Sequence, residues 1–356
     1  MHYKIMIAGD LHKRMKDITT IRGYCEVNRK IQLDLIQAIK DLGITHFISL
    51  GDWFDSGYGS DVSAALAHTD IDVEMSKVLK GNFYGLIGNH IRLRMDSNPE
   101  LFLIQPHDVY KSRHPITRDY QIIKTPKDLI LNGVQIHFMH WYKAAESAAD
   151  YKAMINPDCH YHIGLYHTEY IIPSNYLYDL NMDGMASDNT VISRALDGIN
   201  LAIVGHVHKA IGMFNIAKND GTTTTMIVPG SLTNTDAGEL SRHDYIDIPI
   251  IDIDEDGKVK LSLHHFNLRT NELKFEPKLK SNEYKEKLKS LRGNSKDALY
   301  EELRDTSFVG EHTQFTTLNM FFKEQGYTTC DKDMVRNVIS NPEDIQSLRQ
   351  AYMAQE

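Results

Sequence analysis

Short apolar runs that end in glycine and a polar side chain recur along this chain, and they restrict its fold more than any other feature. In the first, residues 5–8 are apolar, and Gly9, Asp10 and His12 follow. Apolar residues at helical spacing over 31–42 separate this run from the next, at residues 46–50. A strand, a helix and a second strand predict a parallel sheet, and therefore an α/β fold. The other runs end in Gly51-Asp52, Gly88-Asn89-His90 and Gly205-His206-Val207-His208.

The polar groups at these strand ends have the composition of a metal site. Parallel strands bring their carboxyl ends to one edge of a sheet, where such proteins bind ligands. Mixed carboxylate, amide and imidazole donors suit manganese, iron or zinc, and one carboxylate can bridge two ions. Two adjacent ions clamp both sides of a phosphorus centre and make hydroxide available at neutral pH, so the pattern predicts phosphoester hydrolysis. The expected ligands are Asp10, His12, Asp52, Asn89, His206 and His208, with one more histidine between Asn89 and His206.

The remaining patterns complete the expected order of elements. Helices are predicted over 61–80 and 143–154, strands over 134–141, 160–166 and 223–228, and a hairpin over 245–254 and 259–266. Residues 13–30, 99–135 and 173–198 have no clear period and are expected to form loops or irregular structure. From about residue 271 the chain is helix-prone and rich in Lys and Glu. We therefore expect a catalytic domain of residues 1–270 and an accessory region of residues 271–356.

Composition argues against several classes of protein. The 356 residues contain no apolar run near the roughly 18 residues that a membrane span needs. We therefore expect no membrane span and a cytoplasmic location. The three cysteines, Cys25, Cys159 and Cys330, are scattered and do not indicate a disulfide framework or a thiolate zinc site. The net charge of −9 disfavours a broad basic surface for nucleic acid.

The order GDLH, GDWFD, GNH, a single histidine and GHVH resembles the calcineurin-like metallophosphoesterases, over residues 9–208. The resemblance implies a four-layer α/β/β/α sandwich with a C-terminal cap or helical appendage. It also implies two divalent ions, most simply Mn²⁺, with Mg²⁺, Fe²⁺ or Zn²⁺ as alternatives. By resemblance, the first ion takes Asp10, His12 and His208, the second takes Asn89, His206 and the single histidine, and Asp52 bridges both. His90 is then the catalytic residue near the substrate, and Asp55 is a hydrogen-bonding neighbour rather than a ligand.

The single histidine is either His140 or His167. His140 ends a clean strand, as the fourth motif of the family often does. His167 also follows an apolar run, and it fits the branch that contains the SbcD-type DNA-repair nuclease subunits, in which a strand without a ligand comes first. That branch favours His167. His160 and His162 are expected to be structural or surface residues.

The chain departs from the family at the position after GNH. An acidic residue usually follows there and orients the histidine, whereas this chain has Ile91. Either another carboxylate such as Asp96 takes that role, or His90 works with a different pKa. The nearby Arg92, Arg94 and Asn98 are either phosphate-binding groups or solvated loop residues.

The resemblance leaves three functions open. A Pro229-Gly230-Ser231-Leu232 segment, with Glu239 shortly after it, is similar to one in SbcD-type nucleases. It favours a manganese-dependent DNA exonuclease and endonuclease of repair or recombination, a homodimer with an SMC-like (SbcC-type) ATPase partner. That partner is expected on C-terminal helices that carry apolar positions from Met334 to Tyr352. The second function is a stand-alone phosphodiesterase or phosphatase for nucleotides or small phosphoesters. The third is a catalytically silent scaffold, which the intact ligand motifs disfavour.

Overall fold

The structure is a computed structural model, and it describes most of the first three quarters of the chain. The described residues are 1–14, 17–18, 20–55, 70–90, 123–141, 145, 147–177, 187–218, 220–235 and 243–275. The chain divides into two units, Met1–Glu276 and Pro277–Glu356. The predicted C-terminal helices and their apolar docking positions lie in the second unit, outside the described residues.

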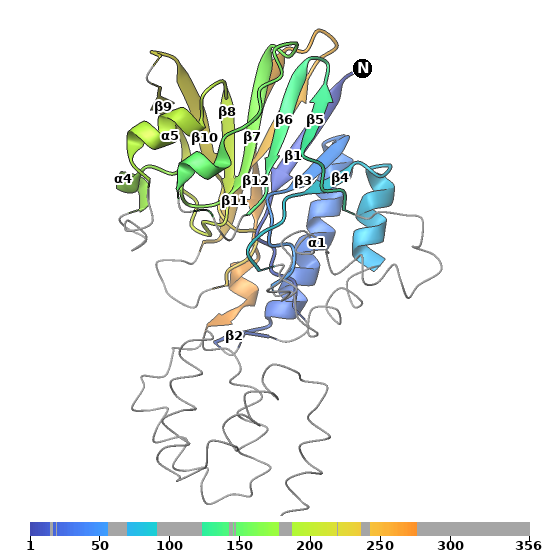
Figure 1. The fold of residues 1–356 in the computed structure, drawn as a ribbon. Coiled ribbons are helices and arrows are strands. Elements are labelled where there is room, and N and C mark those ends of the chain that lie inside the picture. Colours follow the sequence, from blue (N-terminus) through green and yellow to red (C-terminus); the bar gives the residue numbers. More distant parts are fainter. Residues whose placement is uncertain are drawn as a thin grey trace, which may run out of the picture. The chain divides into compact units, whose positions relative to one another are not determined.

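The first sheet has five strands in the order β12-β11-β1-β3-β4 (Figure 1). β1 and β3 are parallel, as are β3 and β4, whereas β11 runs antiparallel to β1 and to β12. The sequence therefore predicts the parallel core and the closing hairpin of this sheet. The strand bounds are β1 Tyr3–Ala8, β3 His46–Ser49, β4 Phe83–Gly85, β11 Tyr245–Ile253 and β12 Val259–Asn267.

The second sheet has six strands in the order β5-β6-β7-β8-β10-β9. The four central strands are parallel, and the two edge strands pair antiparallel with their neighbours. The bounds are β5 Asp128–Leu131, β6 Val134–Met139, β7 Tyr161–His167, β8 Leu201–Gly205, β9 Gly212–Ala217 and β10 Thr223–Val228. A further short pair joins β2 (Ile21–Arg22) to β13 (Lys274–Phe275).

The two sheets pack face to face, with helices on both outer faces, which confirms the predicted α/β/β/α sandwich. An apolar cluster that includes Ile5, Ile48, Ile136 and Ile203 fills the space between the sheets. A second cluster packs α1 (Tyr24–Asp41) and helical residues 70–78 on the first sheet, and a third packs η3 (Ala148–Tyr151) and α5 (Asn189–Ala195) on the second. β1 and β8 are buried at their carboxyl ends on both faces, as parallel strands in such a layer are.

The first helix begins seven residues before the predicted start, at Tyr24. Gly23 precedes it in the left-handed conformation, with a φ of 80°. The carboxylate of Asp17 accepts hydrogen bonds from the amides of Gly23 and Cys25, which cap this end of the helix. The first turns of α1 contain many polar residues, so the apolar spacing is not apparent in the sequence there. Tyr24 and Val27 are nevertheless buried in the structure. The prediction of a loop across residues 13–30 is therefore wrong for its last third.

Three other predictions of local structure are wrong. Across 143–154 the described residues form only the 3₁₀ turn η3, where Ser147 and Asp150 make a capping box but Lys152 is already extended. The expected loop of 173–198 contains α4 (Ser174–Leu177) and α5, whose first turn is capped by the Asp188 carboxylate. The expected irregular stretch of 99–135 ends in β5. In the two expected loops, a local cap or a neighbouring strand produces an element although the sequence has no clear apolar period there.

The remaining described elements are short. A 3₁₀ turn, η7 (Thr270–Glu272), leads into β13. Among the described residues, the helices are too short or too polar to span a membrane.

Candidate metal centre

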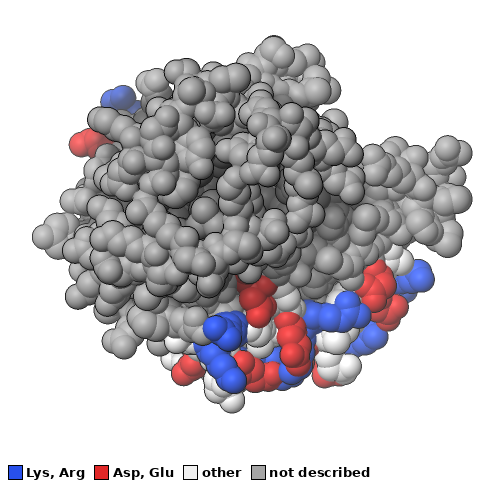
Figure 2. Space-filling view, turned by 90° about the horizontal axis from the view of Figure 1, so that it is seen from below, with Lys and Arg blue, Asp and Glu red and all other residues white. Residues whose placement is uncertain are grey.

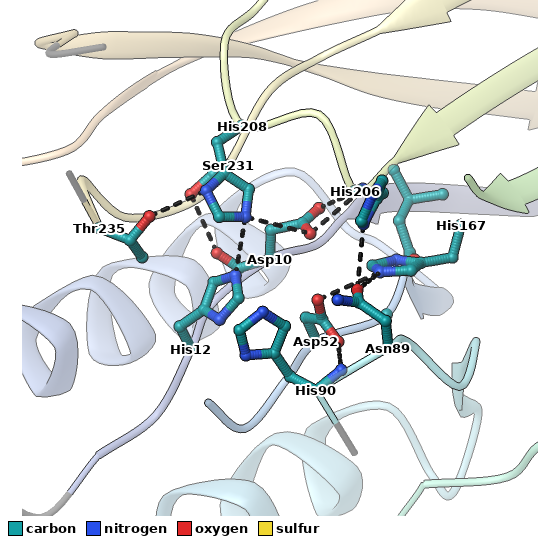
Figure 3. A network of polar contacts seen from close by, with 12 residues as sticks. Asp10, His12, Asp52, Asn89, His90, His167, His206, His208, Ser231 and Thr235 are labelled. Atoms are coloured by element: carbon teal, nitrogen blue, oxygen red, sulfur yellow. Dashed lines mark hydrogen bonds and ion pairs between the residues drawn. The ribbon is translucent and has the colours of Figure 1, made fainter. Parts of the chain in front are cut away.

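The polar strand ends of both sheets meet at one edge of the sandwich. The ends of β1, β3 and β4 are adjacent in the first sheet, and His167 at the end of β7 lies opposite Gly205 at the end of β8 in the second. A bridge between Gly9 and Ser231 brings the segment after β10 next to β1. Figure 3 shows the resulting cluster, to which five strand ends contribute side chains.

The first half of the cluster contains Asp10, His12 and His208. One ligand atom from each lies within 4.8 Å of the others. The two imidazoles face each other, with 3.0 Å between His12 Nε2 and His208 Nε2, and His208 Nε2 lies 3.9 Å from Asp10 Oδ1. Asp10 and His12 are buried, whereas a third of the His208 side chain is exposed.

The second half contains Asp52, Asn89, His167 and His206. His167 Nε2 lies 3.1 Å from Asp52 Oδ2 and 3.0 Å from Asn89 Oδ1. His206 Nδ1 lies 3.0 Å from the same Asn89 oxygen. Asp52 also groups with His12 and His90. Asp52 therefore lies between the two halves, where a bridging carboxylate belongs.

The donor set fits a cation in each half. Nδ1 of His167 donates to the carbonyl oxygen of Leu50 at 2.7 Å, so in the neutral ring Nε2 carries a lone pair. That lone pair points at two oxygen acceptors. The Nε2 atoms of His12 and His208 also lie 3.0 Å apart, a distance that needs a proton or another cation between them. Acceptors that face acceptors repel unless a positive charge lies between them. A proton can supply that charge, and so can a divalent ion, to which all these atoms are suitable ligands.

The electrostatics of the cluster favour positive charge. Burial lowers the pKa of His167, but the charge of Asp52 and the hydrogen bond to it outweigh burial and raise the pKa to about 9. For Asp52, burial raises the pKa, and the charge of His167 more than offsets it, so the pKa lies well below its usual range. Burial raises the pKa of Asp10, and nearby Asp52 adds to this effect. Two fully buried carboxylates thus depend on cationic partners.

The backbone at the ligands is unusual. Asp10, His12, Asp52 and His206 have positive φ values of 55°, 47°, 42° and 75°. Such conformations cost about 1–3 kcal/mol each for residues other than glycine, and they persist only where the surroundings hold them. The left-handed turns aim successive side chains into the cluster, which an ordinary extended strand cannot do because its side chains alternate between faces.

Side chains that the sequence analysis did not assign hold the first of these turns. Ser231 Oγ donates to the carbonyl oxygen of Asp10 at 3.1 Å, and Thr233 Oγ1 donates to that of Leu11 at 3.1 Å. From α1, Tyr24 OH donates to the carbonyl oxygen of His12 at 3.1 Å, and Asn28 Nδ2 to that of Leu11 at 2.6 Å. These residues are nearly inaccessible to solvent. The only sequence signal was the Pro-Gly-Ser segment, which was noted for its resemblance and not for this role.

Glycine precedes the ligands because any side chain there would collide with them. A Cβ on Gly51 would lie 2.3 Å from His167 Nδ1, and the φ of 114° at Gly51 already disfavours other residues. A Cβ on Gly88 would lie 2.0 Å from Asp52 Oδ1. Contacts this short require the ligand itself to move. The recurrent glycines of the sequence pattern therefore have a steric role in the cluster.

His90 lies beside the cluster, and more than a third of its side chain is exposed. Its amide donates to Asp52 Oδ1 at 3.0 Å, and its Nδ1 donates to the carbonyl oxygen of Asp55. The carboxylate of Asp55 lies 3.9 Å from His90 Nδ1, 3.4 Å from His12 Nδ1 and 3.2 Å from Arg14 Nε. Asp55 thus lies close to His12, His90 and Arg14 at the side of the cluster. Ile91, Arg92, Arg94, Asp96, Asn98 and Glu239 lie outside the described residues.

His140 and His167 have different surroundings. Nδ1 of His140 accepts the amide hydrogen of Ile87 at 3.1 Å, and the backbone of Pro126 is a further hydrogen-bond partner of the side chain. Burial lowers the pKa of His140 to about 4 despite that bond. The structure thus brings His167 into the cluster, whereas Nδ1 of His140 is engaged by the Ile87 amide. His160 and His162 hydrogen-bond to the carbonyl oxygens of Gly257 and Cys159.

Two further side chains contact the outer nitrogens of the cluster histidines, and the sequence analysis missed both. Glu169 Oε2 lies 3.0 Å from His206 Nε2, and Thr235 Oγ1 lies 2.8 Å from His208 Nδ1. Burial raises the pKa of Glu169, but the hydrogen bond from His206 and its charge lower it below its usual value. The position of Glu169, two residues after His167, was a weak signal that became informative only with the fold.

Comparisons with known proteins give weak likenesses. No protein-family model matches the chain, and no curated protein does. Similar solved structures include a 5'-nucleotidase precursor from Thermus thermophilus (12% identity, TM-score 0.40, covering 82% of this chain and 59% of that one). Others are an NAD nucleotidase from Haemophilus influenzae (13%, 0.40, 82% and 56%) and a purple acid phosphatase from yellow lupin (11%, 0.41, 74% and 52%). The chain thus spans between 52% and 59% of the length of these proteins.

Proposed function

We propose that this chain hydrolyses phosphoesters with the help of two divalent metal ions. One observation carries the proposal. Strand ends far apart in the sequence place two buried carboxylates and four imidazoles in two groups, and the inner nitrogen of each imidazole lies 3.0–3.1 Å from a carboxylate oxygen, an amide oxygen or another imidazole nitrogen. A structural role does not require acceptors to converge in this way, because unpaired buried acceptors are destabilising.

The arrangement suggests how the ions would be held. Asp10, His12 and His208 would bind one, and Asn89, His167 and His206 the other, with Asp52 shared. When bound, a pair of divalent ions supplies positive charge to the phosphoryl oxygens and makes hydroxide available at neutral pH. Manganese suits this mixture of oxygen and imidazole donors, as do iron and zinc.

His90 is the group of the chain that we propose to act on the substrate. Because its Nδ1–H donates to the carbonyl oxygen of Asp55, the tautomer is fixed and Nε2 is left for the substrate. The partly exposed ring can reach a bound phosphoester. When protonated, Nε2 can donate its proton to the departing oxygen or hydrogen-bond a phosphoryl oxygen. A positioned acid of this kind contributes about 10²–10⁴-fold to a rate.

Charge favours nucleotides or other small phosphoesters as substrates. DNA binding depends on Lys and Arg side chains that neutralise successive phosphates. The chain has a net charge of −9, and on the face shown in Figure 2 the described Lys and Arg side chains are interleaved with Asp and Glu. Several described Lys and Arg side chains form ion pairs, such as Lys30 with Glu26 and Arg269 with Asp34. The charges of the described residues therefore suit a small anion at the metal centre better than a long polyanion.

A DNA nuclease of the SbcD type is the second candidate. The Pro229-Gly230-Ser231 segment supports it through its similarity to a segment of SbcD-type nucleases, and in this chain the segment lies against the turn that carries Asp10. On this reading the protein is a manganese-dependent exonuclease and endonuclease. Its homodimerisation and its SMC-like ATPase partner remain proposals, because the region expected to carry that partner lies outside the described residues.

The test begins with metal-free protein, to which Mn²⁺ is returned. Hydrolysis of bis(p-nitrophenyl) phosphate, p-nitrophenyl phosphate and nucleoside monophosphates is measured beside the degradation of linear and circular DNA. We expect Mn²⁺-dependent hydrolysis of the small esters. The His90→Asn variant should lose at least about 100-fold in kcat while it binds the same amount of metal.

Each outcome has a clear meaning. Degradation of linear DNA with little action on small esters favours the nuclease. Failure to hydrolyse any of these substrates with Mn²⁺, Fe²⁺ or Zn²⁺ overturns the proposal and favours the scaffold function. A loss of metal from His90→Asn shows instead that His90 is a ligand.

A further inference from the structure

The outer nitrogens of the four cluster histidines have partners of different kinds. Nδ1 of His167 donates a hydrogen bond to the backbone carbonyl oxygen of Leu50. The hydroxyl group of Thr235 contacts Nδ1 of His208. Among the described residues, the shortest carboxylate contact to an outer nitrogen is that of Glu169 with His206, since Asp55 is 3.4 Å from His12 and is shared with Arg14. These outer contacts decide which nitrogen of each ring is free to face the cluster.

We propose that Glu169 is a positioning residue that fixes His206 in the tautomer whose Nδ1 binds metal. The proposal rests on the proposed function. The oxygen Oε2 of Glu169 lies 3.0 Å from His206 Nε2, and this carboxylate can only accept, so Nε2 carries the proton. Nδ1 then has a lone pair, and it lies 3.0 Å from Asn89 Oδ1, on the side of the cluster that contains Asp52 and His167.

The fold makes this contact a consequence of strand pairing. His167 ends β7 and lies opposite Gly205, directly before His206. Glu169 follows two residues after His167 and is nearly inaccessible to solvent. One strand end thus supplies an inner imidazole, while the turn after it supplies the outer acceptor for the imidazole of the neighbouring strand. The ends of β7 and β8 thus cooperate at one candidate metal position.

His206 needs such an anchor because its backbone is strained. Its φ of 75° is costly for a residue other than glycine, and its amide contacts both carboxylate oxygens of Asp10 at 3.2 Å. Glu169 therefore completes a set of contacts that holds His206 by its amide, by its outer nitrogen and by its inner nitrogen. A negative charge at the outer nitrogen also makes the inner nitrogen a better ligand.

The chain contains a matched control for this contact. On the outer face of the same sheet, Asp128 Oδ1 lies 2.8 Å from Nδ1 of the buried His137. The chemistry is the same carboxylate–imidazole pair, but neither residue belongs to the groups of candidate ligands among the described residues. A purely structural contribution from a carboxylate–imidazole contact should therefore be similar at both places.

The first test is metal binding by Glu169→Gln and Glu169→Asp, with Asp128→Asn as the control. Metal-free protein is titrated with Mn²⁺, and free Mn²⁺ is followed by electron paramagnetic resonance. We expect Glu169→Gln to weaken one of two Mn²⁺ sites by about 10–100-fold. Glu169→Asp should restore part of the affinity, and Asp128→Asn should leave both sites within about twofold of the unmodified protein. Wild-type affinity of both sites in Glu169→Gln overturns the proposal.

The second test uses the unmodified protein. In metal-free protein labelled with ¹⁵N-histidine, the two-bond couplings of the His206 ring report which nitrogen carries the proton. We expect Nε2–H at neutral pH, and a neutral ring with Nδ1–H overturns the proposal. Both readouts are independent of catalysis. If Glu169→Gln loses metal but the unmodified protein hydrolyses no phosphoester, the proposed function fails while the role of Glu169 stands.

Discussion

Replacing the two competing histidines separately tests the assignment of the second metal position. Removing the His167 ring by His167→Ala leaves Asp52, Asn89 and His206 as ligands for that ion. The loss of an outer hydrogen-bond partner already costs about 10–100-fold in metal affinity, and the loss of a direct ligand should cost more. We therefore expect at least about a 100-fold loss, which corresponds to about 2.7 kcal/mol of binding free energy.

His140→Ala should have the opposite profile. It removes the acceptor of the Ile87 amide, which belongs to a residue that is only 5% exposed. An unsatisfied buried donor costs about 1–3 kcal/mol in the free energy of unfolding. The variant should therefore melt several degrees lower than the unmodified protein but bind both ions with unchanged affinity.

Metal content after dialysis against a limiting concentration of Mn²⁺ is the decisive measurement, together with the melting temperature of each metal-free protein. His167→Gln is a second variant that keeps polar bulk in the site. The reasoning is refuted if His140→Ala loses one ion while His167→Ala retains two. A loss of metal from both variants also refutes it, because it makes His140 necessary to the centre.

Three further perturbations test other parts of the structure. Lys13→Met removes one partner of a fully buried ion pair next to the first ligand turn. It should lower the free energy of unfolding, measured in urea titrations, by about 3–5 kcal/mol. The control Lys40→Met, at an exposed ion pair, should change this free energy by less than about 0.5 kcal/mol. Burial, aided by the charge of nearby Lys124, lowers the pKa of His46 to about 4. Between about pH 4 and 6.5 the unfolded chain therefore binds more protons than the folded chain, and the free energy of unfolding should fall as the pH drops through that range. His46→Phe should reduce this slope, which is at most about 1.4 kcal/mol per pH unit, and an unchanged slope contradicts the assignment. Gly51→Ala should displace the His167 ring and lower the metal content to that of His167→Ala, so full metal content in this variant argues against the close approach.

Local patterns in the sequence were sufficient for much of the fold. The buried parallel strands are recognisable because both of their faces need apolar side chains, as in Ile5 to Ala8 and Leu201 to Val204. The start of α1 and the helix α5 were missed, because their ends depend on the carboxylates of Asp17 and Asp188 rather than on apolar spacing. Each such cap depends on one side chain, and many Asp residues in a sequence could cap a helix, so these helix ends are difficult to predict from the sequence.

The sequence by itself determined which chemical groups the centre contains, because a strand that ends in glycine and a polar residue places that residue at the edge of a parallel sheet. The strand pattern alone could not separate His140 from His167, since both follow apolar strands, although the resemblance favoured His167, and it could not identify Glu169. Only the tertiary structure decided where these three side chains lie. The register of β7 against β8 places His167 beside His206 and Glu169 against the outer nitrogen of His206, and the Ile87 amide hydrogen-bonds to the ring of His140. A strand pattern is local, whereas a ligand set depends on which strands become neighbours.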